Sequence, residues 1–226
     1  MVDLKAACQE IMEAGQELYR KGLIVGTDGN LSARLDDGTI AITASGACKG
    51  KLTPEQICVV SRSGQLLHGP KPARDIRMHL AVYRERPEAM AVVHAHPPVI
   101  TGLSATRFDF ERVLFPEALF NLRGICLTEY AVPISVDVSR KVTDALRANP
   151  DSRAVVLANH GVLTFAETVM EAFYALESAE LVAKSTLVAL LAGQPRFLTE
   201  AENRDLARLL AGVSPDSIVP PDANGL

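Results

Sequence analysis

The sequence lacks the features that mark several large classes of protein. No apolar run approaches the ~20 residues that a membrane-spanning helix needs, and the richest stretch, 181–191, is interrupted by Lys184 and Ser185. The chain has no cluster of Lys or Arg longer than a pair, and its net charge is -4. Neither a nucleic acid nor a membrane is therefore an expected partner. A Walker lysine loop and a GxGxxG fingerprint are also absent, so nucleotide binding is not supported.

Cysteine is scarce and is not spaced for a metal site. The four cysteines fall without CxxC spacing, at Cys8, Cys48, Cys58 and Cys126. No basic, apolar and then small-residue segment at the start of the chain suggests export. We therefore expect reduced thiols in a cytoplasmic protein.

Length and composition predict one globular domain. The chain has 226 residues, of which 48% are hydrophobic and 22% charged, enough to bury a sizeable core. We place the domain at residues 1–212. Residues 213–226 are rich in Pro, Asp and Gly and are expected to form a flexible tail.

The hydrophobic pattern alternates between the periods of helices and strands. Helices are predicted over 3–21, 72–85, 136–148, 165–192 and 200–210. Strands are predicted over 31–35 and 39–43, which form a hairpin, and over 57–61, 91–96 and 154–158. This order predicts an α/β layered domain with a central, mainly antiparallel sheet flanked by helices.

Two histidines end one of these strands, in the segment 92–98 (VVHAHPP). Alternate residues of a strand project to one face, so His94 and His96 are expected to point the same way. Pro97 and Pro98 stop the ladder where a cavity can open, and the pair then supplies half of a tetrahedral metal site. The alternative is two half-buried histidines whose ring nitrogens bond to the backbone.

A third histidine has a similar setting. The predicted strand 154–158 runs directly into the sequence Asn-His-Gly that contains His160. Zinc enzymes typically use three protein ligands and leave the fourth position to water or substrate. His94, His96 and His160 together therefore predict an open metal site.

The two remaining histidines are assigned no ligand role. His79 lies near the start of a predicted helix and is expected to pack or cap, and His68 lies beside a turn and is expected to be solvated. The expected ion is Zn²⁺, although imidazole ligands also accept Mn²⁺ or Co²⁺ according to supply.

Two glycine-containing loops can present hydrogen-bond donors to an anion. Segment 26–32 (GTDGNLS) joins the first helix to the first strand, and segment 43–47 (TASGA) follows the second strand. Glycine lets backbone N–H groups face an anion, and Asn and Ser side chains add to them. If the loops converge, the expected substrate-binding residues are Gly29, Asn30, Ser45 and Gly46. The alternative for the first loop is a Gly-Asn turn without a ligand.

Six short motifs resemble, in their order, those of the class II aldolase/adducin family. They are Gly29-Asn30-Leu31-Ser32, Thr43-Ala44-Ser45-Gly46, Leu52-Thr53-Pro54, Lys71-Pro72 followed by Asp75 and His79, His94-Ala95-His96, and Asn159-His160-Gly161. The resemblance covers about residues 4–210. It implies a sheet of about nine strands, a homotetramer with active sites between subunits, and His94, His96 and His160 as the zinc ligands.

The chemistry of such a site requires a carboxylate near the metal. Cleaving a carbon–carbon bond beside a ketone produces an enediolate, whose charge a metal ion stabilises as a Lewis acid. A carboxylate must then move the proton, and Asp75, at a helix start just before the histidine strand, is the best-placed candidate. The alternative role of Asp75 is that of a helix N-terminal acid stabilised by the helix dipole.

The chain departs from the aldolases of the family around this acid. The aldolases have glutamate where this chain has Asp75, whereas the 4-epimerase has an aspartate that resembles a metal ligand, so both roles stay open. Ala73 and Arg74 replace two serines that bind the substrate phosphate in the family. Arg74 is therefore a candidate to hold a phosphate or to clamp a carboxylate, the alternative being that it faces solvent.

The proton donor of the aldolases is also missing. The family places one tyrosine after the histidine strand and another in the C-terminal tail. This chain has Phe115-Pro116-Glu117 in the first place and no tyrosine after Phe197. Glu117 is the candidate replacement, reaching a neighbouring subunit's metal, or else an ordinary surface acid.

These residues predict a class II, metal-dependent aldolase. The first hypothesis is retro-aldol cleavage, or aldol addition, on a short ketose phosphate like fuculose 1-phosphate or on a related hydroxy-keto compound. A pentulose-phosphate 4-epimerase and a keto-acid decarboxylase are the alternatives on the same scaffold. A non-catalytic adducin-like module is disfavoured because all three histidines are present. The exact substrate and stereochemistry are not predicted.

Overall fold

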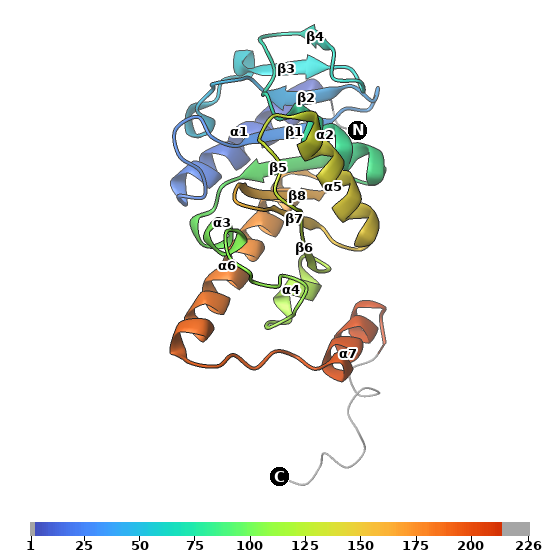
Figure 1. Ribbon diagram of the computed structural model, residues 1–226. Helices are drawn as coiled ribbons and strands as arrows, with labels where there is room; N and C mark the ends of the chain where they lie inside the picture. The colour runs from blue at the N-terminus through green and yellow to red at the C-terminus, as the bar shows by residue number, and fades with distance from the viewer. Residues whose placement is uncertain (1–2, 214–226) are drawn as a thin grey trace.

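The computed structural model describes residues 3–213 (Figure 1). Of the tail expected at 213–226, all but the first residue lies outside the described residues. The described chain forms one layered α/β domain in which a central sheet separates two groups of helices. The layered fold predicted from the sequence is therefore confirmed.

The sheet has eight strands within the described residues, in the order β4-β3-β2-β1-β5-β8-β7-β6. Their bounds are β1 Asn30–Arg34, β2 Ile40–Thr43, β3 Ile57–Val60, β4 Leu66–His68, β5 Ala91–Ala95, β6 Ile125–Leu127, β7 Ala154–Leu157 and β8 Gly161–Ala166. All neighbours pair antiparallel except β6 and β7, which are parallel. The mainly antiparallel sheet was expected, but the expected count of about nine strands was slightly too high.

Helices cover both faces of the sheet. Their bounds are α1 Leu4–Arg20, α2 Ile76–Glu85, α3 Pro98–Ser104, α4 Glu117–Phe120, α5 Val136–Ala148, α6 Val169–Ala192 and α7 Glu200–Leu210, with short 3-10 turns at Lys49–Lys51 and Pro54–Gln56. Residues of α1, α3 and α6 share one hydrophobic core, and residues of α2 and α5 share the other. Because both faces of the sheet are covered, the central strands β1, β5, β7 and β8 are buried on both sides.

One predicted helix began too early. The segment 165–192 was expected to be helical throughout, but Phe165 and Ala166 end strand β8 and α6 begins at Val169. Thr168 accepts a hydrogen bond from the Glu171 backbone, and the Glu171 side chain reaches back to the Thr168 backbone. This capping box fixes the helix start, and the strand was missed because its residues form a continuous apolar run.

A second helix also starts later than expected. The segment 72–85 was predicted to be helical, but Pro72 pairs with Ala44 in an isolated bridge and α2 begins at Ile76. Asp75 occupies the N-cap position of α2. The extended segment before it therefore brings the 43–47 loop next to the start of α2.

The segment after β5 is held by a buried acid. Pro97 ends the strand as predicted, and α3 follows at once, which was not expected. The carboxylate of Glu180, 1% exposed on α6, accepts hydrogen bonds from the backbone N–H groups of Val99 (3.2 Å) and Ile100 (2.9 Å). These bonds satisfy free donors in the first turn of α3 and fix the direction in which the chain leaves the histidine strand.

Two further expectations concerned the thiols and the absence of a membrane-spanning helix. All four cysteines are free. Among the described residues, no helix combines the length and the apolar character that crossing a bilayer requires.

Candidate metal centre

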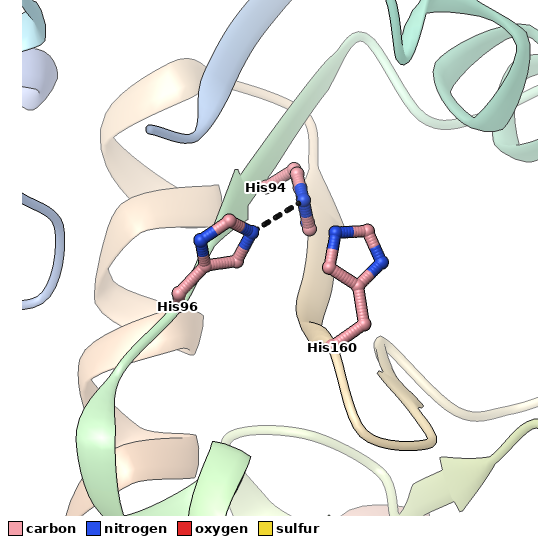
Figure 2. Close-up of side chains that lie close together, drawn as sticks. All are labelled: His94, His96 and His160. Carbon is pink, nitrogen blue, oxygen red and sulfur yellow. Dashed lines mark hydrogen bonds between the residues drawn. The ribbon is translucent and has the colours of Figure 1, made fainter. Parts of the chain in front are cut away.

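Three imidazole rings converge where the ends of the neighbouring strands β5, β8 and β7 meet (Figure 2). His94 lies in β5, His96 just beyond its end, and His160 in the turn between β7 and β8. Their ring centroids are 4.8 to 5.1 Å apart, and one ligand nitrogen from each lies within 4.8 Å of the others. The two Nε2 atoms of His94 and His96 are 3.1 Å apart, close to the roughly 3.3 Å that separates two nitrogens on one tetrahedral zinc ion. The convergence predicted from the sequence is thus present.

The backbone fixes which nitrogen His94 offers. Its Nδ1 lies 3.0 Å from the carbonyl oxygen of Val162 on the neighbouring strand. A carbonyl only accepts, so Nδ1 carries the proton and Nε2 presents its lone pair to the centre. This bond sets the tautomer and the ring orientation, as outer hydrogen bonds do for metal ligands generally.

Burial keeps the three imidazoles neutral. It lowers the pKa of His94 well below its usual value, and the neighbouring imidazoles His96 and His160 lower it further. Burial also lowers the pKa of His96 and of His160, partly opposed by the charge of Asp75, and at His96 also by that of Asp28. Neutral imidazole is the form that binds metal, so these residues fit a divalent ion with an open coordination position.

Two glycines make room for the cluster. A Cβ atom on Gly161 would lie 2.5 Å from Cδ2 of His96 and 2.6 Å from the carbonyl oxygen of Ala95. A Cβ on Gly29, which has φ +70°, would lie 2.7 Å from the carbonyl oxygen of His94. Gly161 is a functional residue that sequence reasoning quoted in a motif but gave no role.

Asp75 lies beside the histidines with one oxygen free. Its Oδ2 accepts a hydrogen bond from Nδ2 of Asn30 at 3.1 Å. Its Oδ1 is buried and has no hydrogen-bond partner among the described residues, and the side chain does not cap α2. The carboxylate is therefore available to a ligand rather than used by the helix.

Two charged side chains near the centre were not assigned from the sequence. A carboxylate oxygen of Asp28 lies 3.8 Å from Nδ1 of His96. Lys49 is only 2% exposed, and its Nζ donates to the carbonyl oxygens of Thr27 (2.6 Å) and Ala47 (2.8 Å). Burial lowers its pKa to about 8, opposed by nearby groups that include Asp28. Lys49 thus ties the 26–32 loop to the 43–47 loop, so the two loops do converge, the condition on which the candidate anion site depended.

The candidate substrate-binding residues occupy different depths. Gly29 and Asn30 are buried at the base of the centre, whereas Ser45, Gly46 and Arg74 are exposed. Gly46 has φ +76°, a left-handed conformation that glycine adopts at little cost. The Arg74 side chain makes no hydrogen bond or ion pair with any described residue, so its donors are free.

Glu117 is not brought to the histidines within one chain. It begins α4, is exposed, and forms no ion pair with a described residue. The cavity beside His160 is small, about 10 Å³, whereas a cleft of about 730 Å³ lies at the opposite ends of the strands and is lined by none of the three histidines. The large cleft is lined by residues such as Arg86, Ser152 and Phe165. We place the chemistry at the three histidines and not in this cleft, because the side chains that can bind a metal converge there.

Comparison with known proteins identifies one family. The profile of the "Class II Aldolase and Adducin N-terminal domain" matches residues 9–187. A 3-oxo-tetronate 4-phosphate decarboxylase from Haemophilus influenzae is 34% identical over 210 residues, which cover 91% of this chain and 98% of that protein. A methylthioribulose-1-phosphate dehydratase from Methylococcus capsulatus is 36% identical over 186 residues, covering 79% and 91%.

A solved structure agrees with these relatives. The structure of an L-fuculose 1-phosphate aldolase superposes on this chain with a TM-score of 0.83 at 28% identity, covering 91% of this chain and 96% of that one. Three different reactions are thus represented among similar proteins. The common scaffold does not by itself select one of them.

Proposed function

Because the chain belongs to the class II aldolase and adducin family, we propose that it is a divalent-metal-dependent lyase acting on a short phosphorylated hydroxy-keto compound. The bond broken joins the carbon next to the ketone to the following carbon, so that the electrons left behind form the enolate or enediolate. One observation carries the proposal: three neutral imidazoles face one point, and a carboxylate with a free oxygen lies beside them.

Each group has a defined task. His94, His96 and His160 would hold the ion, which when bound supplies a Lewis acid for the negative charge that develops on the substrate oxygens. Asp75 would transfer a proton to or from the substrate through Oδ1, while the amide of Asn30 holds Oδ2 by a hydrogen bond. The free oxygen equally fits a direct contact with the ion, so base and ligand remain the two roles to be tested.

Residues of the two loops beside this centre, together with Arg74, would hold the anionic end of the substrate. The backbone N–H groups of the loops at Gly29 and Gly46, together with the Ser45 hydroxyl, offer neutral donors. Arg74 offers a free guanidinium that suits phosphate or carboxylate. The three relatives described above are named for reactions of phosphorylated sugars or sugar acids, which supports this assignment.

The leaving fragment distinguishes two candidate reactions. In retro-aldol cleavage, the reaction predicted from the sequence, the hydroxyl that becomes the aldehyde carbonyl must give its proton to a group of the protein. Decarboxylation of a 3-oxo acid releases CO₂ and needs no such group. None of the four tyrosines, Tyr19, Tyr83, Tyr130 and Tyr174, hydrogen-bonds to the histidines, Asn30 or Asp75 in the described structure. This favours decarboxylation as the second candidate, and a decarboxylase relative at 34% identity supports it.

We also propose that the site is completed in a homotetramer, as the resemblance implies. Within one chain the cavity beside His160 is small, and Glu117 lies at the start of α4. Exposed apolar side chains on α6, such as Leu181, Val188 and Leu191, are available for contacts between subunits. Glu117 of one subunit would then serve the centre of its neighbour.

A product assay tests the proposal. Metal-loaded protein is incubated with ketose 1-phosphates, ketose 5-phosphates and phosphorylated 3-oxo acids, and aldehyde, epimer, dehydrated product and CO₂ are measured separately. We expect turnover that is lost on chelation and restored by Zn²⁺, Mn²⁺ or Co²⁺. Aldehyde release selects the aldolase, CO₂ the decarboxylase. Turnover that survives complete removal of the metal would contradict the proposal.

A further inference from the structure

A chain of hydrogen bonds runs from the interior of the domain to Asp75. The Tyr83 hydroxyl lies 2.7 Å from Oγ of Ser32, and this Oγ lies 2.7 Å from Nδ1 of His79. Nε2 of His79 lies 2.5 Å from Oδ1 of Asn30, whose Nδ2 donates to Asp75 at 3.1 Å. His79 is the middle member of this chain and makes no contact with solvent.

The spacing of the five residues explains how they meet. Asn30 and Ser32 are two apart on β1, so they project to the same face of the sheet. Asp75, His79 and Tyr83 are four apart at the start of and along α2, so they lie on one face of the helix. Packing α2 on the sheet therefore brings two regular rows of polar groups together.

Burial forces every member of the chain to find a protein partner. His79 and Ser32 are 0% exposed, Asn30 3% and Tyr83 7%. Polar groups at such depth are costly unless they are hydrogen-bonded. Both ring nitrogens of His79 are used, which distinguishes this histidine from the three at the metal centre.

The donors and acceptors fit only one arrangement of protons when Asp75 is a carboxylate. A carboxylate only accepts, so the amide nitrogen of Asn30 must face Asp75 and the amide oxygen must face His79. The amide oxygen also only accepts, so Nε2 of His79 carries the proton and Nδ1 is bare. Ser32 then donates to Nδ1 and accepts from Tyr83.

The two titratable groups at the interior end do not disturb this arrangement. Burial lowers the pKa of His79 to about 3 and raises that of Tyr83. The imidazole is therefore neutral, and the phenol protonated, over the range in which enzymes work. An imidazolium would donate from both nitrogens and leave no acceptor for Ser32.

The consequence appears at Asp75. With one oxygen held by Asn30 and none used to cap α2, the orientation of the carboxylate depends on the orientation of the Asn30 amide. If that amide turned over, its oxygen would face the carboxylate and repel it. The amide is prevented from turning by the N–H of His79.

We propose that His79 is a positioning residue: its Nε2–H holds the Asn30 amide in one orientation, and Asn30 in turn aims the free oxygen of Asp75 at the metal centre. The role of Asp75 as a working group rests on the proposed function. The proton arrangement of His79 does not, so the two can fail separately.

Nuclear magnetic resonance tests the arrangement directly. The full chain, loaded with diamagnetic Zn²⁺ and labelled with ¹⁵N at histidine, reports the ring-nitrogen shifts of His79. We expect the tautomer protonated at Nε2 and bare at Nδ1, unchanged between about pH 6 and pH 9 because the group is buried. An imidazolium, or the tautomer protonated at Nδ1, would overturn the proposal even if the enzyme were active.

Two substitutions at one position test the effect on the reaction. His79→Gln can place an amide N–H where Nε2 was and keep the bond to Asn30, whereas His79→Asn is too short to reach it. We expect His79→Asn to lower kcat by about 10- to 100-fold with little change in KM, and His79→Gln to stay within about three-fold of wild type. Ser152→Ala is the control, because it removes a buried hydroxyl that bonds to Gly124 and Ala154 away from the centre.

Several outcomes would contradict the proposal. Equal loss of kcat in both His79 variants, or a loss in Ser152→Ala of the same size, would indicate a structural role only. Loss of bound zinc in His79→Asn would indicate an effect on the ligands instead of on Asp75. If the wild-type protein cleaves no compound of the panel, the proposed function fails while the tautomer measurement still decides the role of His79.

Discussion

His79 and the three histidines of the metal centre lie close to each other in this fold, and they differ in what their ring nitrogens contact. His79 has both ring nitrogens satisfied, by Ser32 and Asn30. At the metal centre, Nε2 of His94 faces only Nε2 of His96, another imidazole nitrogen. Burial is the same for His79 and His94, at 0% exposure.

The comparison shows that burial alone does not identify a ligand. A buried histidine with two partners is a structural or positioning group, whereas buried lone pairs that face one another require a cation between them or a shared proton. Asp75 stands between the groups, with Oδ2 partnered and Oδ1 free. If this distinction holds, substitutions at the metal centre and substitutions at the fully partnered groups should have different effects.

The largest effect is expected at the metal centre itself. His96→Ala removes one of three ligands and should abolish both metal binding and activity while leaving the fold nearly intact. The loss of metal affinity should exceed the ~100-fold that removal of an outer hydrogen-bond partner costs. Metal content and circular dichroism of the purified variant measure the two effects. Full turnover in this variant would refute the assignment of the ligands.

A smaller loss is expected when the room for the cluster is removed. The added methyl of Gly161→Ala would collide with His96 and with the backbone of Ala95. We expect a destabilisation of about 1–3 kcal/mol and weaker metal binding. Gly102→Ala is the matched control, because its Cβ would meet nothing within 4 Å and a helical alanine should stabilise by about 0.4–1 kcal/mol. Equal behaviour of the two variants in urea unfolding and zinc titration would contradict this account.

Much of the fold was predictable where the signals are local. Helices over 136–148 and 200–210 were predicted with the observed bounds, since both have regular apolar spacing. The hairpin of β1 and β2 follows from alternating residues around an Asp-Asp-Gly turn. In contrast, β8 shows no alternation of apolar and polar residues because both of its faces are buried. Strand β6 is short and pairs in parallel with β7, which is distant in sequence.

The site was predictable only in part, for a related reason. The three histidines were found because strand geometry and Pro97 place them without reference to the rest of the chain. Lys49 was missed because a buried lysine contradicts the usual preference of lysine for the surface, and only the meeting of two loops gives it acceptors. Asp28 and Gly161 were visible in the motifs, but their roles depend on where His96 lies.

The pH dependence of the free energy of unfolding tests whether His79 is neutral in the folded protein. The folded pKa of His79, about 3, lies below the ~6.5 of an unfolded histidine. Below pH 6.5 the unfolded chain therefore binds the extra proton, and stability is lost as the pH falls from about 6.5 toward 3. In the metal-free protein, His79→Gln should reduce this slope by at most ~1.4 kcal/mol per pH unit. Urea unfolding at several pH values measures it, and an unchanged slope would mean that His79 is already charged in the folded state.

The same distinction between partnered and free groups applies to two arginines. Arg86 is 8% exposed, and its guanidinium donates to the carbonyl oxygens of Leu146 and Asn149, whereas Arg74 is exposed with free donors. A charge-assisted contact contributes about 1.5–3 kcal/mol, so Arg74→Ala should raise KM for an anionic substrate roughly ten-fold or more. Arg77→Ala, which changes an exposed arginine in the first turn of α2, should leave KM unchanged. If both variants keep the wild-type KM, Arg74 merely faces solvent. The absence of protein partners at an exposed arginine near the metal centre would then not indicate a binding site.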